Sequence, residues 1–257
     1  MSKTGRRDVD LPGAFAALAL SPEDIIHEAA GIPSTQVSRK RDIIVAGEHC
    51  ETVFINHAGW LFRYKILHNG NRQILDFILP GQVFGLQACL FESSLYSIAT
   101  ITDVSLSMIP LDMIERMAER SPELVKALFR SATCEAAILG EHLIDASRRS
   151  ARERIGHLLL ELFLRLKSAG LVEGMSFEMP LTQELISDAV GLTTVHVNRT
   201  LRSLRDAKLI AIDGSNVTIL DFEALSRLCG FENGYLGEAA RKHPTGMNPP
   251  RRATADD

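Results

Sequence analysis

The chain has 257 residues and a mass of 28.3 kDa; 46% of its residues are hydrophobic and 23% are charged. At roughly 150 residues per domain this length predicts one or two domains, and the composition excludes a chain that is disordered throughout. The formal net charge is −4, so nucleic-acid binding would need a local basic patch, and the absence of a long apolar run argues against a membrane span.

Flexible tails are predicted at both ends, over residues 1–13 and 232–257. The second contains two adjacent prolines and few large apolar side chains, too little to offset the entropy of ordering. The charged N-terminus lacks the apolar segment of a signal peptide, so we expect a cytoplasmic protein. The cysteines form no CxxC pair and no metal-ligand spacing, which predicts reduced thiols and no metal site; they are Cys50, Cys89, Cys134 and Cys229.

Residues 14–120 predict an N-terminal domain built mainly from short strands. A short helical segment over residues 14–31 comes first, with a start signal at Ser21-Pro22. Apolar runs then alternate with turn residues about every ten positions, and Asn69-Gly70 is a strong hairpin signal. The spacing favours a small β sandwich or barrel. The candidate strands are residues 42–45, 52–56, 60–67, 72–77 and 105–110.

The pattern becomes helical at Pro110. A helix is expected over residues 111–120, and Ser121-Pro122 opens a second one over residues 121–149, which at 1.5 Å per residue is about 40 Å long. Its apolar side fits a partner helix, so we interpret it as a dimerisation helix. The alternative is that it packs on its own β domain. The residues assigned to the dimer contact are Leu124, Leu128, Ile138 and Leu139.

Residues 150–231 predict a winged helix. An amphipathic helix over residues 152–167 is followed by helices over 181–190 and 193–208, separated by Gly191-Leu192. Strands over 209–212 and 217–220 flank Asp213-Gly214, a hairpin signal. The order is that of a helix-turn-helix followed by a β wing.

The second helix of this pair carries the functional signal. Thr182 and Thr193 are placed to cap the two helices, and Gly191 occupies the sharp turn. An apolar stripe, Val197, Leu201 and Leu204, faces inward. The opposite face carries Thr194, His196, Asn198, Arg199, Arg202 and Arg205. Residues 193–205 include three arginines and no acids, which favours a helix in the DNA major groove over a merely solvated face.

These features resemble the Crp/Fnr superfamily of bacterial transcription regulators. The similarity spans roughly residues 14–230 and rests on the helix-turn-helix and on four further sites: Gly47-Glu48, Leu79-Pro80-Gly81, Ser121-Pro122 and Arg154-Ile155. It implies an α+β fold: an N-terminal double-stranded β-roll (jelly-roll-like) of cyclic-nucleotide-binding type, a long dimerisation helix and a C-terminal winged helix-turn-helix. It also implies a homodimer on palindromic double-stranded DNA and contact with RNA polymerase.

The resemblance assigns roles on the recognition helix. Arg199 matches the principal base-reading position, and Thr194, Val195 and Asn198 match other groove-facing positions. Many relatives have glutamate where this chain has Val195, so the preferred DNA site should differ. His196 lies near the backbone and either bonds a phosphate or packs partially. Thr182, Thr193 and Arg202 complete the expected DNA-contacting set.

The effector site departs from the cyclic-AMP-binding pattern. Leu86 or Gln87, after Gly85, replaces the ribose-binding carboxylate, and Tyr96, before Ser97, replaces the phosphate-binding arginine. Leu139 replaces an adenine-contacting residue of the long helix. Burying an anion without a cation is costly, so we expect weak or no cyclic-AMP binding.

Other sensor types fit poorly. The iron–sulfur branch needs an N-terminal cysteine cluster, and no cysteine precedes Cys50. Cys134 is either a redox reporter or, by preference, a small buried apolar residue. We predict no cofactor and leave the effector unknown.

The sequence holds no nucleophile elbow, P-loop, zincin or dinucleotide motif, so an enzyme is not expected. The hypothesis is a sequence-specific DNA-binding transcription regulator that does not respond to cyclic AMP. The alternative is a ligand-sensing module whose winged helix docks a protein instead of DNA.

Overall fold

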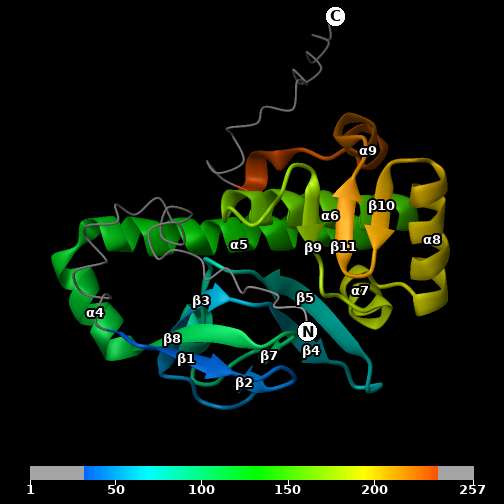
Figure 1. The fold of residues 1–257 in the computed structure, drawn as a ribbon. Coiled ribbons are helices and arrows are strands. Elements are labelled where there is room, and N and C mark those ends of the chain that lie inside the picture. Colours follow the sequence, from blue (N-terminus) through cyan, green and yellow to red (C-terminus); the bar gives the residue numbers. More distant parts are fainter. Residues whose placement is uncertain (1–31, 237–257) are drawn as a thin grey trace, which may run out of the picture.

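The computed structural model describes residues 32–236, which form a β-roll, a long helix and a C-terminal domain of helices with a small sheet (Figure 1). The roll consists of two four-stranded sheets, with strand orders β1-β8-β3-β6 and β2-β7-β4-β5. The strands are β1 (Ser34–Val37), β2 (Asp42–Ile44), β3 (Thr52–Ala58), β4 (Leu61–Ile66), β5 (Arg72–Ile78), β6 (Val83–Phe84), β7 (Ser97–Thr100) and β8 (Val104–Pro110).

The roll closes around apolar side chains contributed by both sheets. Phe54 and Leu106 come from one sheet, Leu61 and Ile98 from the other, and all four are buried in one cluster. The Asn69-Gly70 turn joins β4 to β5 as an antiparallel hairpin, as predicted, with Leu67 N–H donating to Asn71 O over 2.8 Å.

Three strands of the roll and one short helix were not foreseen. They are β1, β6, β7 and α3 (Leu86–Leu90), and the strands have two to four residues each. Such short elements hold no complete period of an apolar pattern, and their place is set by pairing with distant strands. β1, for example, pairs with β8 through Ser34 opposite Ser107.

Two helices leave the roll. α4 (Leu111–Arg120) leads to α5 (Pro122–Arg148), whose N-cap Ser121 accepts from Leu124 N and whose first residue is Pro122. The predicted start signal and length of the long helix are therefore confirmed. Figure 1 shows α5 crossing the molecule above the roll and reaching the C-terminal domain.

Two of the four residues assigned to the dimer contact are buried within the chain. Leu124 and Ile138 are only 5% and 4% exposed, because α5 turns this side toward its own chain, and Leu128 and Leu139 are half-buried. Packing on the β domain, the alternative interpretation, holds for Leu124, which joins the cluster of Val53 and Ile109. Leu124 and Ile138 are therefore not available to a partner helix, while Leu128 and Leu139 stay predicted contacts.

The C-terminal domain surrounds α6 (Ala151–Ser168), which starts with a capping box between Ser150 and Glu153. Around it lie β9 (Ser176–Glu178), α7 (Gln183–Val190), α8 (Thr194–Asp206), β10 (Ile210–Asp213), β11 (Asn216–Ile219) and α9 (Phe222–Cys229). The sheet order is β10-β11-β9, and the β10–β11 hairpin is the predicted wing. Leu159, Leu160 and Phe163 are buried because α6 is covered on several sides.

The predicted C-terminal tail begins too early. Residues 233–236 form a short 3-10 helix, η1 (Asn233–Leu236), and the Tyr235 ring stacks on His157 with centroids 5.9 Å apart. Tyr235 also donates to Glu161 over 3.2 Å, so an aromatic residue with a polar partner anchors this segment. The tail over residues 1–13, the helix over 14–31 and the remaining tail over 237–257 lie outside the described residues.

Across residues 32–236, no helix combines the length and hydropathy that a membrane span requires.

Candidate nucleic-acid interface

The helix-turn-helix has the caps that its sequence predicts. Thr182 accepts a hydrogen bond from Leu185 N, and Thr193 accepts one from His196 N, each over 3.2 Å. Gly191 ends α7 in the left-handed region, at φ 67° and ψ 40°, where a side chain would be strained. These local contacts fix where α8 begins.

α8 divides into a buried and an exposed face. Val197, Leu201 and Leu204 are buried, as predicted, and Thr200 joins them. The exposed face brings together Thr194, Val195, Asn198, Arg199, Arg202 and Arg205, while His196 is half-buried. Val195 is 80% exposed, so its side chain is open to a contact outside the chain. Figure 1 places α8 at the outer edge of the molecule, away from the roll.

The exposed face of α8 is positively charged although the chain as a whole has a net charge of −4. α8 extends to Asp206, whose carboxylate lies 3.9 Å from Arg202 Nε, so one of the three arginines has an acidic neighbour on the helix. Between residues 32 and 236, no ion pair involves Arg199 or Arg205. Two unpaired guanidinium groups on an exposed helix suit phosphate or guanine contacts.

Sequence reasoning missed one residue of this surface. Gln183 at the start of α7 is exposed and accepts a hydrogen bond from Asn198 Nδ2 over 3.3 Å. The two amides line a hollow that also includes Arg205 and the wing residues Gly214 and Ser215. No local pattern marked Gln183, because the contact depends on how α7 crosses α8.

Side chains from other elements hold α7 in place. Arg154 of α6 donates to Val190 O over 3.2 Å, at the end of α7. Arg72 of β5 pairs with Asp188 at 2.8 Å and with Glu184 at 3.4 Å. The helix-turn-helix therefore contacts both its own domain and the roll.

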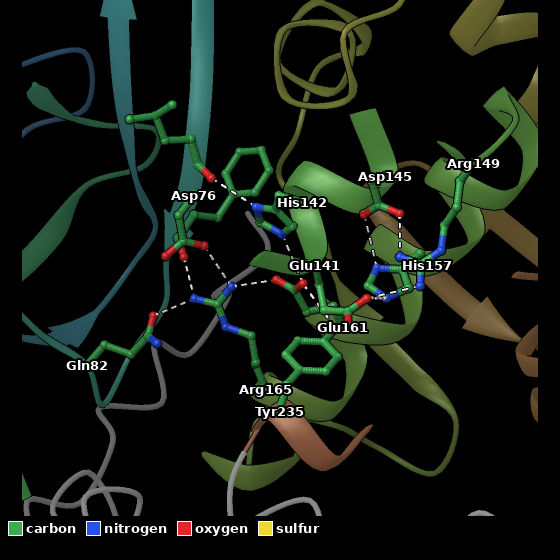
Figure 2. Close-up of polar contacts among 12 residues, drawn as sticks. Asp76, Gln82, Glu141, His142, Asp145, Arg149, His157, Glu161, Arg165 and Tyr235 are labelled. Atoms are coloured by element: carbon green, nitrogen blue, oxygen red, sulfur yellow. Dashed lines mark hydrogen bonds and ion pairs between the residues drawn. The ribbon is translucent and has the colours of Figure 1, made fainter. Parts of the chain in front are cut away.

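A buried polar cluster joins the roll, α5 and α6 (Figure 2). Arg165 of α6 donates to Asp76 of β5, to Glu161 of α6 and to Gln82, and its second amino group also donates to Phe77 O. His142 of α5 donates to Leu75 O over 2.9 Å and to Glu161 over 3.0 Å. Because both acceptors are oxygens without protons, this geometry requires the charged imidazolium form of His142.

The charges of the cluster shift its pKa values. Burial opposes the charged forms of His142 and Glu161, but their mutual attraction outweighs it, raising the pKa of His142 to about 9 and lowering that of Glu161 to about 2. Burial likewise opposes charge on Arg165, yet Asp76 and Glu161 raise its pKa. The cluster is thus a set of mutually neutralising ions.

A second group continues along α5 and α6. His157 is fully buried between Asp145, at 3.2 Å, and Glu141, at 3.6 Å, and Arg149 pairs with both carboxylates. Figure 2 shows the two groups side by side, with Tyr235 below Glu161. Neither group was anticipated. Asp76 and Arg165 of the first are 89 residues apart in the sequence, and the second forms only because α5 and α6 pack side by side.

The predicted effector residues assemble only in part. Tyr96 is buried and donates to Gln87 over 2.9 Å, while Ser97 is directed elsewhere and accepts from Ala46 N. Gly85 has φ 94°, and a Cβ there would lie 2.9 Å from Thr52 O, so only glycine fits. Leu86 and Leu139 are half-buried and form no part of the Gln87–Tyr96 contact.

Sequence reasoning also missed a cation in the roll. Arg63 of β4 is 2% exposed, and its guanidinium lies 4.6 Å from the centre of the Tyr96 ring. The expectation that no cation faces this region is therefore wrong. Glu135 of α5 pairs with Arg63 at 2.8 Å, however, so the charge is already balanced within the chain.

Comparison with known proteins identifies both halves. Residues 35–121 match the cyclic nucleotide-binding domain family, and residues 153–228 match the Crp-like helix-turn-helix domain family. The chain is also 32% identical to the nitrogen fixation regulation protein FixK of Rhizobium meliloti over 190 residues, which is 74% of this chain and 83% of that protein. The chain belongs to the Crp/Fnr family.

Further Crp/Fnr relatives match most of the chain. It is 27% identical to the transcriptional activator protein anr of Pseudomonas aeruginosa over 225 residues, covering 87% of this chain and 92% of that protein. The structure of FixK2 from Bradyrhizobium japonicum superimposes with a TM-score of 0.69 at 27% identity, covering 76% of this chain and 96% of that one.

These matches confirm the predicted family and the predicted α+β fold, with its roll, long helix and winged helix-turn-helix. The protein is a Crp/Fnr-type DNA-binding transcription regulator and not an enzyme.

Proposed function

We propose that this Crp/Fnr regulator binds palindromic DNA as a homodimer, with Arg199 and its neighbours on α8 reading each half-site. The observation that carries the proposal is the exposed, arginine-rich face of α8, opposite a stripe that anchors the helix in its domain. An α-helix fits the major groove, arginine can bond guanine bidentately, and asparagine can bond adenine.

The remaining contacts follow from position. Thr194 and Val195 lie with Asn198 and Arg199 on the exposed face, within reach of base edges. Thr182 and Thr193 sit at helix starts, where short polar groups and backbone N–H groups reach phosphates. Arg202 extends the basic face along the groove. His196 is half-buried, so part of its imidazole stays exposed. We assign this exposed part to a phosphate contact.

The dimer is assigned to a face of α5 different from the one predicted. The exposed residues Val125, Phe129, Ala132, Ala136, Gly140, Leu143 and Ser147 follow one another at spacings of three and four. Large side chains stand toward the two ends, and Phe129 and Leu143 are 76% and 69% exposed. Small residues in the middle allow two helices to approach closely in a coiled coil.

The regulator is proposed not to respond to cyclic AMP. Tyr96 stands where cyclic-AMP-binding relatives are expected to have a phosphate-binding arginine, and its hydroxyl donates a hydrogen bond to Gln87. The charge of Arg63 is neutralised by Glu135. An entering cyclic phosphate would have to separate the Arg63–Glu135 pair and leave a carboxylate without its partner. Calorimetric titration with cyclic AMP is expected to show no saturable binding.

Activation through RNA polymerase is also part of the proposal, because the matched Pseudomonas aeruginosa relative is named a transcriptional activator. The polymerase-contacting surface is left unassigned.

The DNA proposal is tested by selecting bound sequences from a random pool and then titrating the selected site. We expect a palindrome whose affinity falls steeply with salt, since arginines displace counterions from phosphates. Arg199→Ala should weaken binding by roughly 1–3 kcal/mol and relax discrimination at one position in each half-site. Arg227→Ala replaces an exposed arginine of α9 and is the matched control. It should change neither the affinity for the selected site nor the discrimination between bases.

Equal binding of the selected and scrambled sites by the parent protein would contradict the proposal. It would favour the alternative, in which the winged helix docks a protein.

A further inference from the structure

Two cysteines that are 39 residues apart in the sequence meet in the roll. The Cys89 thiol points toward the Cys50 sulfur, and the two Sγ atoms are 3.8 Å apart. Cys50 lies in the loop before β3, and Cys89 lies on α3. Both are free thiols. We propose that Cys50 and Cys89 form a reversible disulfide, a thiol-oxidation site in the sensor domain that reacts with hydroperoxides.

The geometry permits the bond with small movements. The sulfur atoms must approach from 3.8 Å to the roughly 2.05 Å of a disulfide. Neither cysteine belongs to a strand, so a shift of its backbone breaks no pairing in either sheet. Cys50 and its neighbours 47–51 form a turn and loop that can absorb the displacement.

The two thiols have different surroundings, which assigns their order of reaction. Cys50 is half-buried and stands next to the exposed residues His49 and Glu51, whereas Cys89 is 8% exposed. Burial raises the pKa of Cys89 to about 12, so its thiolate is scarce at neutral pH. Cys50 is therefore the thiol that a peroxide reaches first, and Cys89 is the thiol that resolves the product.

The chemistry balances in two steps. The Cys50 thiolate attacks a peroxide oxygen, the O–O bond breaks, and hydroxide leaves and is protonated to water, which gives a sulfenic acid on Cys50. The Cys89 sulfur then attacks the Cys50 sulfur, the S–O bond breaks, and the Cys89 proton leaves with the hydroxyl group as a second water. Two thiols are oxidised to one disulfide, and one hydrogen peroxide is reduced to two waters.

The other two cysteines do not share this arrangement. Burial raises the pKa values of both Cys134 and Cys229, and Cys229 donates its thiol to Leu225 O over 2.9 Å. Within the described ranges, no group of three or more histidine, cysteine, aspartate or glutamate side chains is arranged to hold a metal ion. The pair is therefore assigned to a bond between its own two sulfurs.

The bond would lie beneath the helices that leave the roll. Cys89 packs in one cluster with Ile114 and Met117 of α4 and with Leu124 and Ala127 of α5, and Cys50 packs against that cluster. The disulfide would thus join the loop before β3 to α3 at the base of α5.

The test uses the full-length protein and hydrogen peroxide, with alkylation of the remaining thiols and digestion without reductant. Trypsin places each cysteine on a separate peptide: residues 42–63, 73–116, 131–148 and 228–241. We expect peptides 42–63 and 73–116 to become linked, two of the four thiols to be lost, and dithiothreitol to restore both.

Variants separate the two roles. In Cys89→Ser, Cys50 should still be oxidised and be trapped by a sulfenic-acid reagent, but no linkage should form. In Cys50→Ser, Cys89 should stay alkylatable at the same peroxide concentration. Cys134→Ser, a half-buried cysteine of α5, is the matched control and should leave the linkage unchanged.

The proposal is overturned if the folded parent protein keeps all four thiols, or if the linked peptides include residue 134 or 229. Oxidation of Cys89 at the parental rate in Cys50→Ser would overturn the order of reaction. If Cys89→Ser does not fold, the parent protein and Cys50→Ser decide the outcome.

Discussion

Arg165 of α6 donates a hydrogen bond to Asp76 of β5 over 2.8 Å, and the two charged groups are almost completely buried. The pair links the DNA-binding domain to the roll, and Glu161 and His142 extend it to α5. A signal that moves the roll relative to the DNA-binding domain would either leave this cluster intact or break it, so the cluster is a polar constraint on how the domains are placed.

Removing the arginine is expected to be costly. Arg165→Met leaves Asp76 and Glu161 buried without their common partner, and we expect the free energy of unfolding to fall by roughly 3–5 kcal/mol. Arg116→Met removes an exposed arginine that pairs with Asp112 at the same 2.8 Å, and should cost less than about 1 kcal/mol. Denaturant titration of both variants measures the difference. Equal losses would show that the buried pair contributes no more to the free energy of unfolding than the exposed one.

Stability should depend on pH through His142. Its pKa is raised to about 9 in the folded protein, so its contribution is complete below the ordinary value of 6.5 and is lost as the pH rises through 9. The pKa of Glu161 is lowered to about 2, so its contribution is complete above 4.5 and is lost as the pH falls toward 2. Both shifts describe one ion pair and are not added together.

We expect the free energy of unfolding to decline between pH 6.5 and 9. Denaturant titration at each pH measures this decline. His142→Gln keeps a hydrogen-bonding side chain without the titrating group and should flatten this decline. His68→Gln, an exposed histidine of the β4–β5 turn, serves as the control and should leave the slope intact. An unchanged slope in His142→Gln would assign the pH dependence elsewhere.

The dimer face of α5 can be tested without disturbing the core. Phe129→Glu places a charge on a side chain that is 76% exposed in the single chain, so folding should be preserved. Losing an anchor of this kind typically costs about 2 kcal/mol or more of association energy, which is a roughly 30-fold rise in the dimer dissociation constant.

Sedimentation equilibrium provides the measurement for this variant. Ile66→Glu, which alters another exposed apolar residue at the end of β4, should leave the dimer unchanged. A dimer that tolerates Phe129→Glu would move the interface to a different face.

Val195 should set part of the sequence preference. Glutamate at this position can accept a hydrogen bond from cytosine, whereas valine can only contact a thymine methyl group. Selection with Val195→Glu is expected to change one base position in each half-site toward a cytosine. Val195→Ala, which retains a methyl contact, should keep the parental preference; a shift caused by alanine would indicate that helix placement, not the side chain, determines it.

Much of the fold could be predicted because it is encoded locally. The caps at Thr182 and Thr193 and the stripe of Val197, Leu201 and Leu204 each depend on residues within one or two helical turns. The same holds for the Ser121-Pro122 start of α5. The face of α8 that points outward therefore followed from spacing alone.

The dimer residues show where local information ended. The apolar positions of α5 surround much of the helix, so periodicity could not tell which side the roll would cover. The structure turns Leu124 and Ile138 inward and leaves Phe129 and Leu143 outside. The choice depends on packing against segments that are far away in the sequence.

The amino-acid sequence by itself determined the order of the longer helices and strands, the caps and the basic face of α8, since neighbouring residues interact whatever the rest of the chain does. Only the tertiary structure decided that Arg165 meets Asp76, that Arg63 meets Glu135 and that Cys50 meets Cys89. Each pair joins separate elements, and its partners are selected by the closure of the sheets and the docking of helices, which no short window of residues contains.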